Sequence, residues 1–201
     1  MLALDLLLNP SKEEVEGGLT VYFALGHLFP PMVNGSVDVG GYYGVLGTLM
    51  GHEMSHVIDD SLNAWLPPEK LDAFVQEQSH GQLQPAPLAH SFNDQFGVLI
   101  AHDAFERAMQ GQPRPRIDGL SPEQRFFIGV TAWRGGKMWT GTSYTDPGWW
   151  DISGPVRFRF LTNGTLSTLP AFAKAFSCKA GGPMTGAHVW YKDPWNKTRA
   201  P

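Results

Sequence analysis

The sequence feature that most constrains the fold is a pair of histidines, His52 and His56, that flank Glu53 within one short segment. Apolar residues recur at helical spacing between residues 42 and 58, so we expect this segment to form one long helix. Residues four apart in a helix lie one turn above each other, which lets both imidazoles face one metal ion. Glu53 beside them can then take a proton from a water bound to that ion. The alternative is two unrelated histidines on a polar helix face.

Length and charge bound the remaining possibilities. A chain of 201 residues fits one domain, and we expect residues 1–201 to form it. The formal net charge is −4 and no cluster of Lys or Arg is present, which disfavours nucleic-acid binding. The most apolar stretch, residues 19–33, is interrupted by Gly, His and two Pro, so we expect no membrane insertion, and the first residues do not resemble a signal peptide. The single cysteine, Cys178, excludes an internal disulfide and predicts a buried free thiol.

The rest of the pattern predicts a mostly helical chain. Two strands are predicted at 2–8 and 18–25, and turn residues at 9–11 join them. Helices are predicted at 69–78, at 89–109 and just after Leu169. Ser121 and Gln124 form the signature of a capping box, which predicts that a further helix begins at Pro122.

Several groups of residues occur in an order that is typical of one known family. Residues 51–60 contain Gly-His-Glu-Met-Ser-His followed by Val-Ile-Asp-Asp, and residues 122–127 are Pro-Glu-Gln-Arg-Phe-Phe. The later groups are Asn163-Gly164-Thr165-Leu166, Phe172, Ala175-Phe176, Cys178, Gly182-Pro183-Met184 and Val189-Trp190. Together they resemble the catalytic part of the neprilysin and endothelin-converting-enzyme metallopeptidases, whose zinc helix is Gly-His-Glu-x-x-His followed by x-x-Asp-Asp. The resemblance covers nearly the whole chain but only the C-terminal part of those enzymes.

The resemblance implies a fold, a cofactor and a set of site residues. It implies an α+β, zincin-like (thermolysin-like) domain, mostly helical, with a small β-sheet beside the metal-binding helix, and one Zn²⁺ ion. The family takes its third ligand from a Glu-Asn-x-x-Asp helix, and aligning Asp94 with that helix places His90 at the glutamate position. His52, His56 and His90 would then bind zinc, Asp94 would support His52, and Asp59 would support His56. The alternative for His90 is a surface histidine that pairs with Asp94.

Departures from the family pattern leave two functions open. No histidine lies between His102 and His188, where the family has one that stabilises the oxyanion. Arg159, or else Arg157, matches the family arginine that contacts substrate, and a simple surface arginine is the alternative. The first function is a zinc metalloendopeptidase that cleaves peptide substrates with Glu53 as general base. The second is a catalytically impaired family member that keeps the metal and acts as a binding or interaction module.

The family's large helical lid domain is expected to be absent from this chain. Exposed aromatic side chains, from a Trp-rich C-terminal part, would then be covered by a lid domain or by a second chain. Because family members are mostly membrane proteins with an external catalytic part, the resemblance implies an extracellular or membrane-associated location.

Overall fold

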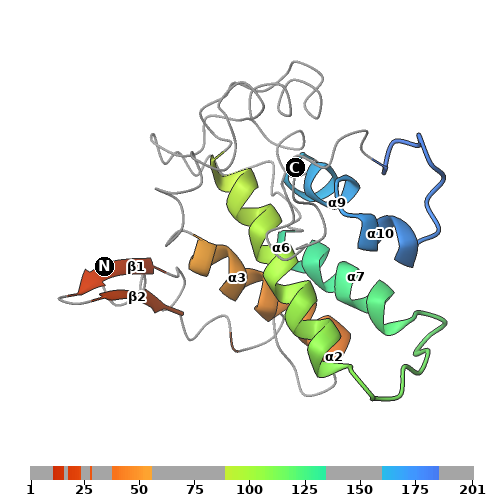
Figure 1. The fold of residues 1–201 in the computed structure, drawn as a ribbon, viewed down its shortest axis with the longest axis horizontal. Helices are drawn as coiled ribbons and strands as arrows, with labels where there is room; N and C mark the ends of the chain where they lie inside the picture. Colours follow the sequence, from red (N-terminus) through yellow and green to blue (C-terminus); the bar gives the residue numbers. More distant parts are fainter. Residues whose placement is uncertain are drawn as a thin grey trace, which may run out of the picture.

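Helix α6 (Ala89–Ala108) runs through the middle of the described part of the chain (Figure 1). This computed structural model describes residues 11–15, 18–23, 28, 38–55, 89–134 and 160–185. Helix α6 packs against the π-helix η2 (Tyr43–Gly47), α3 (Thr48–Ser55) and α9 (Thr165–Ser167). Helix α7 (Pro122–Arg134) packs on η2 and on α10 (Pro170–Ala175). The predicted helix at 89–109 is therefore confirmed, as is the helix after Leu169, whereas the predicted helix at 69–78 lies outside the described residues.

The helix that carries His52 begins earlier than the sequence pattern predicts. Helix α2 (Val39–Tyr42), η2 and α3 follow one another without a break, and the described part ends at Ser55. Glycines at this start have low helix propensity, but they allow close packing on α7. A Cβ atom on Gly44 would collide with the carbonyl oxygen of Phe126. The tertiary contact therefore stabilises a helix that propensity alone disfavours.

The predicted apolar face of this helix is confirmed in part. Val45, Leu46 and Leu49 are buried, as their helical spacing indicates. Met50, which regular helical spacing places on the same face as Leu46, is instead 40% exposed. The π-helical turn of η2 changes the angular spacing of side chains along the helix, so a regular helical pattern misplaces residues after it.

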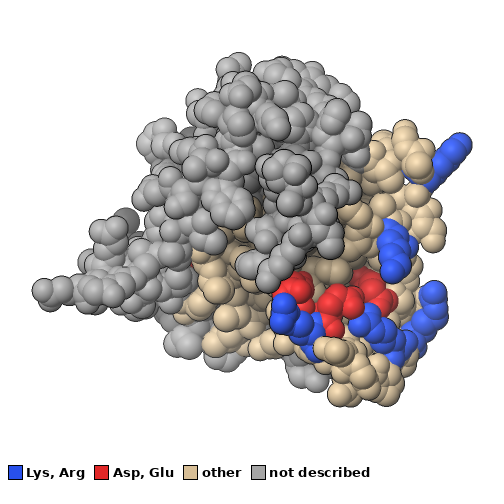
Figure 2. All heavy atoms as spheres, viewed as in Figure 1, with Lys and Arg blue, Asp and Glu red and all other residues tan. Residues whose placement is uncertain are grey.

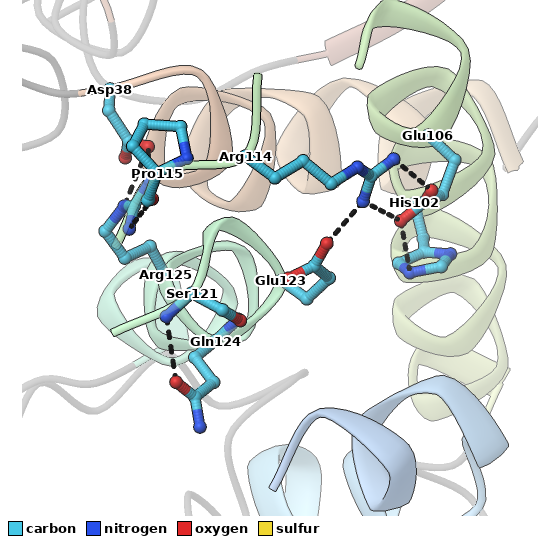
Figure 3. A network of polar contacts seen from close by, with 9 residues as sticks. All are labelled: Asp38, His102, Glu106, Arg114, Pro115, Ser121, Glu123, Gln124 and Arg125. Atoms are coloured by element: carbon cyan, nitrogen blue, oxygen red, sulfur yellow. Dashed lines mark hydrogen bonds and ion pairs between the residues drawn. The ribbon is translucent and has the colours of Figure 1, made fainter. Parts of the chain in front are cut away.

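Helix α7 begins with the predicted capping box. The backbone N–H of Gln124 donates to Ser121 Oγ at 3.2 Å, and the backbone N–H of Ser121 donates to Gln124 Oε1 at 2.9 Å. Two N–H groups that would lack a helical partner are satisfied in this way. Arg125, one residue later, reaches across to Asp38, which precedes α2, with Nη2 2.7 Å from Oδ2 (Figure 3). The start of α7 is thus tied to the start of the His52 helix.

The core lies between α6, α7 and the α9–α10 segment. Its buried members are Val98, Ala101, Phe105, Met109, Phe126, Phe127, Val130, Leu166 and Leu169. Phe105 and Phe126 stack with ring centroids 5.2 Å apart, and Phe127 meets Phe172 of α10 edge-on at 5.4 Å. Helix α9 follows a second π-helix, η4 (Phe160–Gly164). Aromatic packing therefore joins α6 to α7, and α7 to α10.

Two short strands form an antiparallel sheet. Strand β1 (Ser11–Val15) pairs with β2 (Gly18–Tyr22), with Ser11 opposite Tyr22 and Val15 opposite Gly18. Strand β2 falls within the predicted strand 18–25, but Ser11 lies in β1 and not in the predicted turn. The predicted strand 2–8 lies outside the described residues, and the position of a sheet beside the metal-binding helix stays a prediction.

One described face carries charges of both signs (Figure 2). Arg114 Nη2 lies 2.7 Å from Glu106 Oε2 and also pairs with Glu123, which links α6, the connection after it and α7 (Figure 3). Arg107 and Asp103 form a further pair at 2.7 Å along α6.

Among the helices that the structure describes, none has both the length and the apolar character needed to span a bilayer.

Candidate active site

The crossing of α3 and α6 places His52. Two glycines meet at this crossing, Gly51 on α3 and Gly97 on α6. A Cβ atom on Gly97 would lie 2.7 Å from the backbone nitrogen of His52 and 2.8 Å from the carbonyl oxygen of Thr48. Such distances are shorter than real Cβ contacts, so the two backbones approach this closely only because both residues are glycines. His52 is thereby held directly against α6.

Asp94, one turn before Gly97 on α6, contacts His52. Its Oδ1 lies 2.7 Å from His52 Nδ1, and both side chains are almost completely buried. An ionised carboxylate only accepts hydrogen bonds, so Nδ1 carries a proton, and in the neutral imidazole the lone pair is then on Nε2. A histidine with this tautomer is oriented to bind a metal ion through Nε2.

Glu53 lies on the Nε2 side of the same imidazole. Its Oε1 is 4.0 Å from His52 Nε2, and its side chain is 10% exposed. A ring nitrogen and a carboxylate therefore lie side by side in a mostly buried site. The hydroxyl of Ser55 donates a hydrogen bond to the carbonyl oxygen of His52 at 2.6 Å, within the same turn of α3.

The structure brings together three of the predicted site residues, His52, Glu53 and Asp94. The predicted residues His56, Asp59 and Arg159 lie outside the described residues. His90 is in the first turn of α6, four residues before Asp94, and its side chain is not described. Within the described ranges, no group of three or more His, Cys, Asp or Glu side chains is arranged to hold a metal ion.

The described donors nevertheless fit a zinc ion. Imidazole nitrogen is a common zinc ligand, and a carboxylate that fixes its other ring nitrogen is the usual support for such a ligand. His52 and Asp94 have this arrangement at hydrogen-bond distance. The pair is not a surface ion pair, because water is largely excluded from both groups.

Sequence reasoning missed several buried polar residues near this site. Asn93 and Gln95, which flank Asp94, are both almost fully buried. Gln95 Nε2 donates to Thr168 Oγ1 at 2.6 Å, which joins α6 to the segment after α9. Three consecutive polar residues inside an otherwise apolar helical pattern are the sequence signal that indicates this buried part of α6.

Two titratable residues, His102 and Cys178, lie outside this site. His102 is in α6 with its ring stacked on Phe127 at 5.6 Å. Burial lowers the pKa of its imidazole, and the nearby carboxylate of Glu106 offsets this only in part. Cys178 is a free thiol, as predicted, but it is half-buried and not buried. The environment of His102 arises from the aromatic packing of α6 on α7, which local sequence does not reveal.

Comparison with known proteins gives the same family as the motifs. The family model described as "Peptidase family M13" matches residues 84–189. Endothelin-converting enzyme 1 of Mus musculus is 27% identical over 220 residues, which cover 90% of this chain and 26% of that protein. Neprilysin-11 of Caenorhabditis elegans is 27% identical over 201 residues, which cover 85% of this chain and 23% of that protein. The chain thus spans about a quarter of the length of the curated relatives it matches.

Solved structures show the same fold. A crystal structure of the Mycobacterium tuberculosis zinc metalloprotease Zmp1 in complex with an inhibitor matches with a TM-score of 0.61 and 22% identity, over 90% of this chain and 30% of that one. A cryo-electron-microscopy structure of Zmp1 in an open state matches with a TM-score of 0.60 and 22% identity, over 82% and 29%. The predicted zincin-like fold and the resemblance to neprilysin and endothelin-converting enzyme are confirmed. Because the family model covers more than half of its residues, the chain belongs to peptidase family M13.

Proposed function

We propose that this chain forms the zinc-binding catalytic part of a metalloendopeptidase. The contact that carries the proposal is the one between Asp94 and His52 Nδ1, which leaves His52 Nε2 beside the Glu53 carboxylate. His52, His56 and His90 would hold one Zn²⁺ ion. Asp59 would orient His56 as Asp94 orients His52, and Arg159 would contact the substrate. The substrates would be peptides.

The residues around the scissile bond have separate tasks. Zn²⁺, when bound, supplies a Lewis acid that polarises a peptide carbonyl and makes water more acidic. Glu53 accepts a proton from the attacking water on its carboxylate and gives it to the amine nitrogen as the peptide bond breaks. Asp94 holds the His52 ring in one tautomer and orientation throughout. Because Glu53 and His52 are buried, charges at this site act on one another more strongly than they do in water.

A second candidate function rests on a specific departure from the family pattern. The chain has no histidine between His102 and His188 to stabilise the oxyanion. Loss of one such donor lowers the rate by about 10²–10³-fold. Three neutral ligands also attract a divalent cation less than a set with one carboxylate does. These features favour an impaired member that keeps the metal and serves as an interaction module, whereas the retained Glu53 favours the peptidase.

Exposed apolar side chains support a proposal about partners. Met50 and Met54 are one turn apart on α3 and are 40% and 48% exposed, and Tyr42 of α2 is 43% exposed. Exposed apolar side chains that lie together on one surface are a common mark of a site that a partner covers. We propose that a lid domain or a second chain covers them, and that the chain acts in an extracellular or membrane-associated setting, as the family resemblance implies.

One experiment separates the two functions. The chain is purified, loaded with zinc and assayed for metal stoichiometry and for cleavage of a peptide mixture. Glu53→Gln should keep one zinc per chain and lose cleavage by about 10²–10⁴-fold. Glu106→Gln, the same change in an exposed ion pair, is the matched control and should behave like the wild type. Equal residual cleavage with Glu53→Gln would refute the peptidase, and stoichiometric zinc without any cleavage by the wild type would favour the interaction module.

The role of His90 needs its own test. His90→Ala should weaken zinc affinity by about tenfold or more if the imidazole is a ligand. Losing a direct ligand lowers the affinity more than losing a residue that only supports a ligand. His90→Glu should preserve or increase the affinity, because a carboxylate is also a zinc ligand and adds a negative charge. An unchanged affinity in His90→Ala would identify His90 as a surface residue.

A further inference from the structure

The contact between Gly51 and Gly97 lies directly beside the contact between His52 and Asp94. Gly51 precedes His52 on α3, and Gly97 follows Asp94 by one turn on α6. The clash that a Cβ would create is with backbone atoms on both sides. On Gly51 it would lie 2.7 Å from the carbonyl oxygen and 2.9 Å from the Cα of Gly97. Backbone atoms cannot rotate away as side chains can, so the helices themselves would have to separate.

The required separation is large compared with the tolerance of a hydrogen bond. Ordinary van der Waals contact of a Cβ begins at 3.4 Å, so a contact of 2.7 Å must lengthen by about 0.7 Å. The same displacement applied to the 2.7 Å contact of His52 Nδ1 with Asp94 Oδ1 gives about 3.4 Å. An N–H···O hydrogen bond extends only to about 3.2 Å. One added methyl group would therefore break the contact that fixes the His52 tautomer.

We propose that Gly51 and Gly97 are positioning residues, which set the distance from His52 to Asp94 by keeping α3 and α6 in backbone contact. They act through His52 and touch neither metal nor substrate. The expected effect of these glycines on zinc affinity rests on the proposed role of His52 as a zinc ligand. Their expected effect on the His52 imidazole does not, and it should be seen in the metal-free chain as well.

Two other glycines provide matched controls for the substitution. A Cβ on Gly129 of α7 would lie 2.8 Å from the carbonyl oxygen of Gly41, a clash of the same kind at the crossing of α7 with the helix before His52. A Cβ on Gly47 would lie 3.3 Å from the Cβ of Ala101, which is a mild contact at the interface with α6. Gly129→Ala therefore tests a general packing defect, and Gly47→Ala tests a methyl group near α6 that does not force the helices apart.

The experiment compares Gly97→Ala, Gly51→Ala and both controls in the full chain. The first readout is ¹⁵N NMR of labelled histidine in the metal-free protein at one fixed pH, with the His52 signals assigned from their loss in His52→Gln. The wild type and both controls should show a proton on Nδ1, whereas Gly97→Ala and Gly51→Ala should shift His52 toward the Nε2–H form. The second readout is zinc affinity by competition with a chelator. Gly97→Ala and Gly51→Ala should bind zinc about 10–100-fold more weakly than wild type, as is usual when the support of a metal histidine is lost.

Each outcome decides one question. An unchanged His52 tautomer in folded Gly97→Ala would overturn the inference even if the wild type binds zinc. A wild type that shows the Nδ1–H form but does not bind zinc would overturn the proposed function and leave the positioning role standing. If both variants fail to fold while Gly129→Ala folds, the two glycines serve folding as a whole, and the inference is wrong. If Gly129→Ala alters the tautomer as strongly as Gly97→Ala, the effect is not specific to this crossing, which also contradicts it.

Discussion

Replacing Asp38 should separate two contributions that one carboxylate makes to stability. Its Oδ1 accepts a hydrogen bond from the Gly41 N–H at 3.1 Å and caps α2, and its Oδ2 lies 2.8 Å from Arg125 Nε. Loss of a helix cap costs about 1 kcal/mol. Loss of a charged hydrogen bond costs about 1.5 kcal/mol, the low end of its range, because the carboxylate is 25% exposed to water. Asp38→Ala should therefore lower the free energy of unfolding by about 2.5 kcal/mol.

Asp38→Asn is the matched comparison, because asparagine caps helices as well as aspartate does but carries no charge. It should cost only the part that depends on charge, about 1–1.5 kcal/mol. Both values come from urea denaturation of the metal-free chain near neutral pH. An asparagine variant that loses as much stability as the alanine variant would refute the separation into cap and ion pair.

The pH dependence of Asp38→Asn gives an independent check. Burial raises the pKa of Asp38, but hydrogen bonds from Arg125 and from the Gly41 N–H outweigh it, so the net pKa lies below the ordinary 3.8. A carboxyl whose pKa is lowered by folding adds stability above its unfolded pKa, and this stability is lost as the pH falls through the folded pKa. The difference in unfolding free energy between wild type and Asp38→Asn should therefore shrink as the pH falls below 3.8. A difference that stays constant over this range would contradict the argument.

Three further predictions concern the site and the core. Asp94→Asn should weaken zinc affinity by about 10–100-fold in a chelator competition, and an unchanged affinity would show that the contact with His52 does not support the metal. Because burial lowers the pKa of His102 below 6.5, the stability that its neutral form provides is present above pH 6.5 and is lost as the pH falls toward the folded pKa. His102→Phe should reduce this loss in urea titrations at successive pH values, and an unaltered pH profile would contradict it. Phe105→Ala should cost about 3–5 kcal/mol in the same denaturation assay, since the ring is fully buried against Phe126, and a cost below about 1 kcal/mol would place the core elsewhere.

The elements that the sequence predicted well are those that neighbouring residues determine. The capping box of Ser121 and Gln124 spans three residues, and the start of α7 was therefore predictable from the pattern alone. The spacing of apolar residues from 89 to 109 likewise predicted α6. The order of the family motifs was sufficient for the family, because an ordered set of short matches arises rarely by chance.

The features that sequence reasoning missed depend on residues far apart in the chain. Arg125 and Asp38 are separated by 87 positions, and the contact of Gly97 with His52 joins two helices whose crossing no local pattern specifies. The burial of His102 follows from rings on α7. The contact of Asp94 with His52 was expected only through the family resemblance, since the sequence does not contain the distance between α3 and α6. The candidate metal ligands and their supporting carboxylates could thus be named from the sequence, but tertiary packing determines which of these side chains are in contact.

The wide turn of η2 has a consequence for how this helix can change in length. Before η2 the helix packs on α7, and after it the helix packs on α6, so the two halves present different sides to their neighbours. A single-residue deletion between 43 and 47 that converted this turn to ordinary α geometry would remove the extra residue of the turn and leave the downstream helix in nearly the same phase. A single-residue deletion between 48 and 50, where the geometry is already α-helical, would instead rotate everything downstream by about 100° around the helix axis. The imidazole at position 52 would then point away from α6 although every residue of the zinc motif was unchanged. An intact motif in a shortened relative would therefore not guarantee an intact site, and the phase of the helix upstream has to be checked as well.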